Sequence, residues 1–532
     1  MSKTNGNGKK IRDNWGSRIG IILAVAGSAV GLGNFLRFPV QAASNGGGAF
    51  MIPYFISFFL LGIPLMWIEW TAGRYGGGFG HGTAPGIFHT MWEKNRFIKY
   101  FGIVGIFGPL VIFIYYTYIE SWLLGYAFFS LFGNYAQATD RGLMESFLRG
   151  YQGLESNQFF KQGLGVAYFF FIITFLSNIF IIYFGIRKGI EKVSKIAMPI
   201  LLVCGVLIAV RVLTLGTPDP AKPDWNALNG LGYLWNPDFS MLKSAKVWLA
   251  AAGQIFFTLS VGIGVILTYA SYLKKTDDVA LSGLSAASTN EFAEVILGGS
   301  IIIPAAYIFF GPVGIQEVAK GGAFDLGFVT MPLIFQKLAG GMFFAFIWFL
   351  LLFLAGITSS ISLAQPAIAF MEDEFDIKRE KAVWILGVAA FILCQPAIFF
   401  LSKGVVNELD FWGGTFCLVL FGTIEAVLFS WVFGMDKAWE EIHHGADMRI
   451  PGFYKFIIKY ITPLFLLVIL GAWLWQDAPS VIMMESVSPE NKPYVLATRI
   501  GLVIFLGTLA FLVNRAWRRK TRKLSSKGAY SK

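Results

Sequence analysis

Charged side chains are scarce in this sequence. Only 14% of its 532 residues are Asp, Glu, Lys or Arg, whereas 55% are hydrophobic. A soluble chain of this length would need a far more polar surface. The shortage of charge, together with many long apolar segments, therefore predicts an integral membrane protein that crosses the lipid bilayer many times.

Histidine and cysteine are also rare, which bears on catalysis and on disulfides. The histidines fall in predicted loops and the cysteines in apolar runs, and no nucleophile–base pair or metal-ligand cluster is visible. We therefore expect no enzyme and no disulfide framework, and we expect the cysteines to be small buried hydrophobes. The residues concerned are His81, His89, His443 and His444, and Cys204, Cys394 and Cys417.

The net charge of +11 would suit nucleic acid, but its location argues for a membrane instead. Basic residues precede the first apolar segment and follow the last, the pattern typical of cytoplasmic loops and tails. We predict a multi-pass protein of the cell membrane with both termini cytoplasmic and no nucleic-acid partner. The flanking residues are Lys9, Lys10, Arg12 and Arg18, then Arg515, Arg518, Arg519, Lys520, Arg522 and Lys523.

Twelve apolar segments are predicted to span the bilayer as helices. They cover residues 17–42, 49–75, 98–131, 165–185, 190–213, 245–273, 280–310, 341–372, 381–401, 407–434, 455–475 and 494–516. We divide this single domain into a first five-helix repeat (17–213), a second repeat (245–434), two additional helices (455–516) and a basic tail (517–532). The segment 311–340 is a candidate outer cap.

The stretch Ser28–Asn34 interrupts the first span with two glycines and an asparagine, which are poor helix formers. The sixth span carries the same pattern: Val30-Gly31-Leu32-Gly33 is matched by Val261-Gly262-Ile263-Gly264. The two spans cross in opposite directions, which predicts an inverted 5+5 repeat with helices one and six broken at mid-membrane. The alternative is that the glycines only allow close helix packing.

A broken helix exposes backbone groups that suit a cation and an anion. Free carbonyls at the end of one half-helix attract a cation, and free amides at the start of the next attract a carboxylate. Asn34 and Thr258 add side-chain oxygens beside the breaks, and residues 358–360 add three hydroxyls. These hydroxyls could instead bond within their own helix. Carboxylates inside spans are usually functional, although some only bond unwound backbone; they are Glu69, Glu120, Glu291, Glu294 and Glu425.

Two pairs of opposite charges flank the predicted cavity. Arg37 and Asp410 lie toward the outer side, and Arg12 and Asp373 toward the inner side. Each pair could close one end of a central cavity. Ordinary interfacial anchoring is the alternative.

Five motifs resemble the neurotransmitter:sodium symporter family over nearly the whole chain. They are Trp15–Arg18, Ala29–Pro39, Gly46–Phe50, Gly253–Ser260 and Ala355–Ser360. The bacterial leucine-transporting members of the family are especially similar. The resemblance implies two sodium sites. The first would use Ala29, Asn34, Thr258 and Asn290, and the second Gly27, Val30, Ala355, Thr358 and Ser359.

The resemblance also implies a substrate pocket and two gates. The pocket residues would be Ala29, Leu32, Gly33, Ile112, Tyr116, Phe257, Thr258, Ser260, Ile263, Ser359 and Leu363. Arg37, Asp410 and Phe257 resemble the outer gate, and Arg12, Tyr272 and Asp373 the inner gate. Glu294 stands where chloride-dependent relatives have a serine, so its carboxylate would replace chloride.

The pocket departs from the leucine-transporting relatives. Ile263 replaces a phenylalanine, Ile112 and Leu363 replace a valine and an isoleucine, and Ser28 replaces an asparagine. One methylene changes selectivity by only about 1–3 kcal/mol, so the expected substrate is a hydrophobic L-amino acid, with leucine, alanine, methionine and aromatic side chains all open.

We therefore expect a sodium-coupled, chloride-independent symporter that works by alternating access, as helices one, two, six and seven rock against the rest. A membrane sensor of the same fold without concentrative transport is the alternative, and a channel a weaker one. The last two spans contact either a second copy in a homodimer or lipid alone, and the sequence leaves both open.

Overall fold

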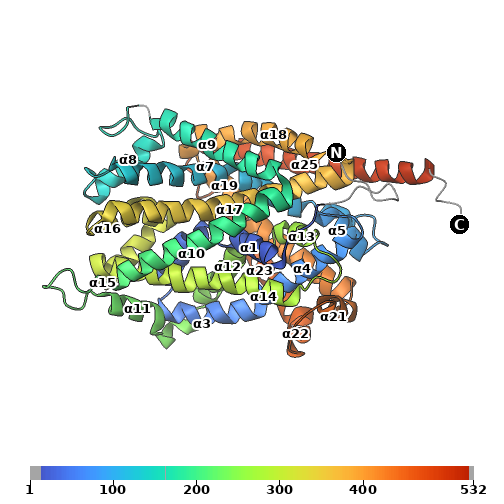
Figure 1. Ribbon diagram of the computed structural model, residues 1–532, viewed down its shortest axis with the longest axis horizontal. Helices are drawn as coiled ribbons and strands as arrows, with labels where there is room; N and C mark the ends of the chain where they lie inside the picture. The colour runs from blue at the N-terminus through green and yellow to red at the C-terminus, as the bar shows by residue number, and fades with distance from the viewer. Residues whose placement is uncertain (1–12, 162, 527–532) are drawn as a thin grey trace.

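The computed structural model describes residues 13–161 and 163–526. Within them every regular element is a helix, and the helices run mostly along the long axis of the molecule (Figure 1). Ten helical stretches are long and apolar enough to cross a bilayer, and an eleventh is the pair Arg18–Ala29 and Gly33–Ser44, bent by 47°. The remaining predicted span, 245–273, is α12 followed by the short α13. The all-α polytopic prediction, with spans one and six broken, is thus confirmed.

The first repeat contains five spans and several short helices. It comprises α1 (Arg18–Ala29), η1 (Gly33–Arg37), α2 (Phe38–Ser44), α3 (Gly48–Ser57), η2 (Phe58–Gly62), α4 (Ile63–Gly78), α5 (Ala84–Met91), α6 (Ile98–Phe101), α7 (Val104–Phe132), α8 (Arg141–Tyr151), α9 (Gly163–Tyr183), η3 (Ile186–Ile190) and α10 (Glu191–Leu213). The connection to the second repeat holds α11 (Ala227–Trp235) and η4 (Phe239–Lys243).

The second repeat contains the next five spans. It comprises α12 (Ala245–Leu259), α13 (Val265–Ala270), α14 (Ala280–Glu291), η5 (Phe292–Gly298), α15 (Gly299–Asp325), η6 (Leu326–Thr330), α16 (Met331–Gln336), α17 (Gly341–Phe375), α18 (Arg379–Phe399), η7 (Leu401–Lys403), α19 (Val405–Leu409), η8 (Asp410–Phe416), α20 (Cys417–Val427) and η9 (Leu428–Val432). After it come α21 (Met435–His443), α22 (Phe453–Phe456), η10 (Ile457–Ile461), α23 (Thr462–Gln476), α24 (Ala478–Ile482) and α25 (Lys492–Ser526).

Short local signals set several helix ends. Ser17, Asp140 and Asn226 precede α1, α8 and α11, and each side chain accepts a hydrogen bond from the backbone N–H three residues further on. Such caps satisfy one of the free N–H groups of a helix start. Gly133 ends α7 in the left-handed conformation that favours glycine, with φ of 68°.

The first and sixth spans lie in the interior of the bundle, whereas the last two lie at its edge. Residues 24–35 are buried without interruption across the first break. In contrast, Val468 of α23 and Val503 of α25 are 68% and 69% exposed. Apolar side chains that face outward in this way suit lipid or a second copy of the chain, so both alternatives for these spans stand.

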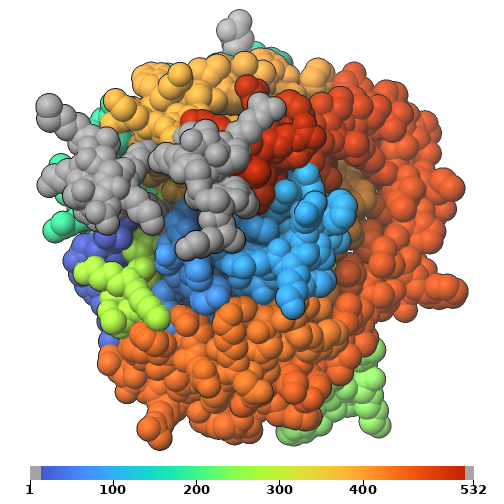
Figure 2. All heavy atoms as spheres, turned by 90° about the vertical axis from the view of Figure 1, so that its right-hand side faces the viewer, coloured from blue at the N-terminus to red at the C-terminus, as the bar shows by residue number. Residues whose placement is uncertain are grey.

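Both described ends of the chain lie at the same end of the bundle (Figure 1). Figure 2 views that end, where residues of α5 lie between α21 and the last turns of α25. At the opposite end (Figure 1), α15 kinks at Gly311 and Gly322 and is followed by η6 and α16. Residues 311–340 are thus a bent helical segment, and their role as an outer cap remains a prediction. The domain boundaries remain a prediction.

Candidate functional site

The first break separates α1 from η1. α1 ends at Ala29, and the next residue, Val30, is extended, with ψ of 95°. The chain turns through Gly31 and Leu32 before helix resumes. The side chain of Asn34 stabilises this turn, since its Oδ1 accepts a hydrogen bond from the N–H of Gly31 at 2.9 Å. An asparagine that bonds backbone nearby favours such a turn over continuous helix.

The second break separates α12 from α13 and depends on glycine. Gly262 and Gly264 have φ of 76° and 81°, which L side chains rarely adopt. A Cβ on Gly264 would lie 2.5 Å from the carbonyl oxygen of Gly105 on α7, so the break also packs tightly against that helix. The freed N–H of Gly262 donates to the carboxylate of Glu69, so Glu69 serves here to bond unwound backbone.

A buried polar cluster lies between the two breaks. The amide nitrogen of Asn34 donates to Asn290 Oδ1 at 2.8 Å and to Thr258 Oγ1 at 3.1 Å. The Thr258 hydroxyl donates to Glu294, whose other oxygen accepts from Gln254 at 2.7 Å. The structure thus brings together Asn34, Thr258 and Asn290, three of the four residues predicted for the first sodium site, with Glu294 beside them.

The donor types in this cluster fit a small hard cation. Amide, hydroxyl and carboxylate oxygens are the ligands that such cations take. No group of three His, Cys, Asp or Glu side chains that could hold a transition metal occurs in the described part of the chain. Asn34 presents its amide nitrogen to the cluster, and its oxygen accepts from Gly31 N–H, so binding of a cation by this oxygen requires the amide to rearrange.

The residues predicted for the second sodium site lie where α17 meets α1. Ser359 Oγ donates to Ala355 O at 3.0 Å and lies 3.4 Å from Gly27 O across the interface. Thr358 Oγ1 donates to Leu354 O and Ala355 O within its own helix. Both hydroxyls therefore bond within their own helix, which was the alternative to cation binding. Ser359 also contacts α1. Val30 directly follows α1.

All eleven predicted substrate residues line one cavity between the two breaks. Its volume is about 70 Å³, small enough to suit one small solute rather than a drug-sized ligand. Tyr116 lies close to the first break, because a Cβ on Gly31 would stand 3.3 Å from its hydroxyl. The eleven are Ala29, Leu32, Gly33, Ile112, Tyr116, Phe257, Thr258, Ser260, Ile263, Ser359 and Leu363.

Several functional contacts were not singled out from the sequence. Ser28 and Ser362 join across the cavity wall, with 2.7 Å between their hydroxyl oxygens. Gln254 holds Glu294 in place, and Tyr54 donates to Glu291 Oε2 at 2.7 Å. In the sequence each of these residues is visible only as a polar side chain within an apolar segment. Its partner could not be predicted, because the partner lies on another span.

The outer-gate residues lie above the cavity without forming the expected ion pair. The guanidinium of Arg37 stacks over the ring of Phe257, 4.5 Å from its centroid, and Asp410 accepts a hydrogen bond from Tyr115. Arg37 also donates to Gly253 O at 3.4 Å. Arg37 and Phe257 together therefore cover the cavity, whereas Asp410 is tied to α7.

The inner-gate residues are only partly described. Arg12 lies outside the described residues, and the hydroxyl of Tyr272 accepts a hydrogen bond from Gln365 at 2.8 Å. Asp373 lies in the last turns of α17 and has an interaction partner. Trp15 closes against α13 from the same side, since its indole N–H donates to Tyr269 O at 2.9 Å.

Arg18 forms an inner ion-pair network that the sequence did not reveal. Its guanidinium contacts Asp278 at 2.6 Å and also Asp447, 429 residues away along the chain. Asp278 is nearly buried, at 3% side-chain exposure. The network ties the start of α1 to the loops before α14 and after α21.

Removing this network should weaken substrate binding. In Arg18→Gln the inner end of α1 is released, so conformations in which the cavity opens toward this end should gain population. The affinity for a solute in the cavity should then fall by about 3–10-fold, since affinity scales with the binding-competent fraction. Arg18→Lys keeps one charge and should lose less. Equilibrium binding to the purified protein measures both, and wild-type affinity in Arg18→Gln would contradict the role.

Comparisons with known proteins agree with this arrangement. The chain is 30% identical over 485 residues to an uncharacterized sodium-dependent transporter of Methanocaldococcus jannaschii, covering 88% of this chain and 91% of that protein. It is 26% identical over 500 residues to the sodium-dependent serotonin transporter of Drosophila melanogaster, covering 87% of this chain and 76% of that protein. The crystal structure of MhsT in complex with L-phenylalanine matches with a TM-score of 0.72 and 30% identity, covering 86% of this chain and 99% of MhsT.

The family model named "Sodium:neurotransmitter symporter family" matches residues 12–141 and 138–506. These matches span almost all the membrane helices and both breaks. The family consists of transporters rather than enzymes. On this evidence the chain belongs to the sodium:neurotransmitter symporter family, and it is a multi-pass, sodium-dependent membrane transporter.

Proposed function

We propose that this transporter is a chloride-independent symporter that takes up hydrophobic L-amino acids together with two sodium ions. It would lie in the cell membrane with both termini cytoplasmic. The observation that carries the proposal is the cavity between the two helix breaks, because it adjoins the cluster of Asn34, Thr258 and Asn290. MhsT was solved with an amino acid bound, which supports the same substrate class here.

The pocket has a polar end and an apolar end, as an amino acid does. The backbone N–H groups of Leu32 and Gly33 lie at the start of η1, where the positive end of the helix dipole favours a carboxylate. The Ser260 hydroxyl donates to Ser28 O at 3.1 Å, so carbonyl oxygens that suit an ammonium group are nearby. Ile112, Ile263 and Leu363 provide the apolar walls.

Sodium and substrate would be coupled through a shared ligand. At the first site Ala29, Asn34, Thr258 and Asn290 would supply protein oxygens, and the substrate carboxylate would complete the set. Each of the two then raises the affinity of the other by the same factor. Gly27, Val30, Ala355, Thr358 and Ser359 would hold the second ion, and movement of the spans carrying α1, α4, α12 and α14 would alternate access.

Scintillation-proximity binding of radiolabelled leucine to the purified full chain tests the proposal. Sodium is exchanged for potassium, and unlabelled alanine, methionine, phenylalanine and tryptophan compete. Binding only in sodium, followed by concentrative uptake into proteoliposomes with a sodium gradient, is the expected result. No sodium-dependent binding of any of the five would overturn the substrate class, and binding without uptake would favour the sensor.

Ile263 should set the side-chain preference of the pocket. It lines the cavity and faces α7. Ile263→Phe fills space, so methionine and phenylalanine should lose about 10-fold in competition relative to alanine, within the range for such pocket changes. Ile263→Val enlarges the same space and should shift the ranking the other way. The same shift in both variants would show that the residue does not face the substrate.

A further inference from the structure

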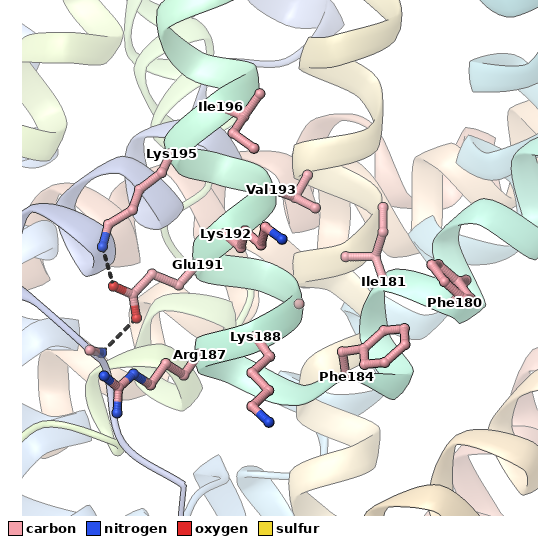
Figure 3. Close-up of a pocket in the computed structure, with 12 residues that line it drawn as sticks. Phe180, Ile181, Phe184, Arg187, Lys188, Glu191, Lys192, Val193, Lys195 and Ile196 are labelled. Carbon is pink, nitrogen blue, oxygen red and sulfur yellow. Dashed lines mark hydrogen bonds and ion pairs between the residues drawn. The ribbon is translucent and has the colours of Figure 1, made fainter.

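A second cavity, of about 830 Å³, lies at the end of the bundle that holds both described chain ends. It is formed by the end of α9, by η3 and by the first turns of α10, and Gly16 lines one side (Figure 3). It is separate from the cavity between the helix breaks and shares no lining residue with it. Transport of an amino acid therefore does not explain it.

The cavity carries an excess of positive charge. Arg187, Lys188, Lys192 and Lys195 line it, against one carboxylate, that of Glu191. Glu191 is already engaged, because one oxygen lies 2.6 Å from Lys195 Nζ and the other accepts from the N–H of Gly16 at 2.6 Å (Figure 3). Arg187, Lys188 and Lys192 are exposed, and in the described part of the chain they form no ion pair. Three positive charges are thus available to an anion.

The other wall of the cavity is apolar. Phe180, Phe184 and Ile196 line it and are 65%, 45% and 54% exposed. Figure 3 shows Phe180 and Phe184 on the α9 side and the basic side chains on η3 and the start of α10. A basic loop at the cytoplasmic surface explains the charges by itself. It does not explain a cavity in which the charges border exposed aromatic rings.

A phospholipid matches both walls, whereas a free anion matches only one. A phosphate headgroup would be attracted by the basic rim, and an acyl chain would cover the apolar side chains. Basic pockets between helices on the cytoplasmic side bind anionic lipid headgroups in this way. The chain's own N-terminal segment is an unsuitable occupant, because Lys9, Lys10 and Arg12 make it positively charged. A positively charged cavity attracts a negatively charged group.

We propose that this cavity binds one anionic phospholipid of the cytoplasmic leaflet. Its headgroup contacts Arg187, Lys188 and Lys192, and one acyl chain lies along Phe180, Phe184 and Ile196. The site depends on the proposed orientation of the chain but not on the transported solute. Because Glu191 joins the same turn to Gly16 and Ser17, the lipid lies beside the anchor of α1.

Native mass spectrometry of the full chain in detergent tests the site. Phosphatidylglycerol and phosphatidylcholine with the same acyl chains are titrated separately. We expect one phosphatidylglycerol to bind about 10-fold more tightly than phosphatidylcholine. In the triple variant Arg187→Gln, Lys188→Gln, Lys192→Gln, phosphatidylglycerol binding should weaken about 10- to 100-fold.

A matched control separates a built site from surface charge. Lys94→Gln, Arg96→Gln, Lys381→Gln removes three exposed charges, two from the connection between α5 and α6 and one from the first turn of α18. It should leave the affinity within about 2-fold. An equal loss in both triple variants, or no loss in the first, overturns the proposal.

The apolar wall has its own test. Phe180→Ala, Phe184→Ala should weaken long-chain phosphatidylglycerol about 10-fold and dihexanoyl phosphatidylglycerol much less, because the shorter chains cover less of the rings. Glycerol 3-phosphate and inorganic phosphate at millimolar concentration should not displace the lipid. Displacement by either would assign the cavity to a soluble anion and overturn the lipid proposal.

Discussion

Glu294→Ser should make substrate binding dependent on chloride. The Glu294 side chain is fully buried and accepts hydrogen bonds from Gln254, Thr258 and Asn34. We propose that with sodium bound beside it this carboxylate is ionised and supplies a fixed negative charge to the predicted first sodium site. Removing a buried charge from its partner costs about 3–5 kcal/mol, so in chloride-free buffer sodium-dependent leucine binding should weaken about 100-fold or more. Chloride should restore most of the affinity by occupying the space that the carboxylate leaves.

Binding of radiolabelled leucine in chloride and in gluconate buffers measures this effect. Glu294→Gln is the control. The amide has the same shape as the carboxylate but no charge, and it leaves no space for a chloride ion. It should weaken binding in both buffers. If Glu294→Ser bound leucine normally in gluconate, Glu294 would not supply charge to the site.

Thr258→Val should nearly abolish sodium-dependent binding. The Thr258 hydroxyl is buried and contacts Glu294, Asn34 and Asn290. Valine has the same shape but leaves these polar groups without a partner and removes one oxygen from the predicted sodium site. Leaving these buried polar groups without a partner costs about 3 kcal/mol of binding free energy. The sodium concentration needed for half-maximal leucine binding should therefore rise about 100-fold.

A sodium titration of leucine binding measures this requirement. Thr423→Val is the matched control, since Thr423 is also buried and its hydroxyl donates to Val419 O in its own helix, away from the predicted sodium site. It should titrate like the wild type. If Thr258→Val and Thr423→Val both titrated normally, sodium would bind elsewhere.

The two breaks could be predicted because their cause is local. Gly262 and Gly264 adopt positive φ, and Gly31 is held by the side chain three residues away. Such conformations depend on residues within one helical turn, so the sequence pattern reveals them. The same holds for the apolar spans, whose length alone matches the bilayer.

The contacts of the outer-gate residues depend on the packing of the helices. Arg37 and Asp410 were paired from their charges and depth, but Arg37 stacks on Phe257 and Asp410 bonds Tyr115. Depth along a helix follows from residue number, whereas the direction of a side chain follows from how that helix is rotated against its neighbours. The gating roles of these residues therefore remain predictions.

By itself the sequence determined that the chain is a membrane transporter with helices one and six broken at mid-membrane, and that polar residues line the breaks. The tertiary structure decided which polar groups meet. Gln254 donates a hydrogen bond to Glu294, and Glu69 accepts one from the N–H of Gly262. Arg18 forms an ion pair with Asp447. The physical reason is distance along the chain: backbone conformation is set within a few residues, whereas these contacts form only when whole helices pack together.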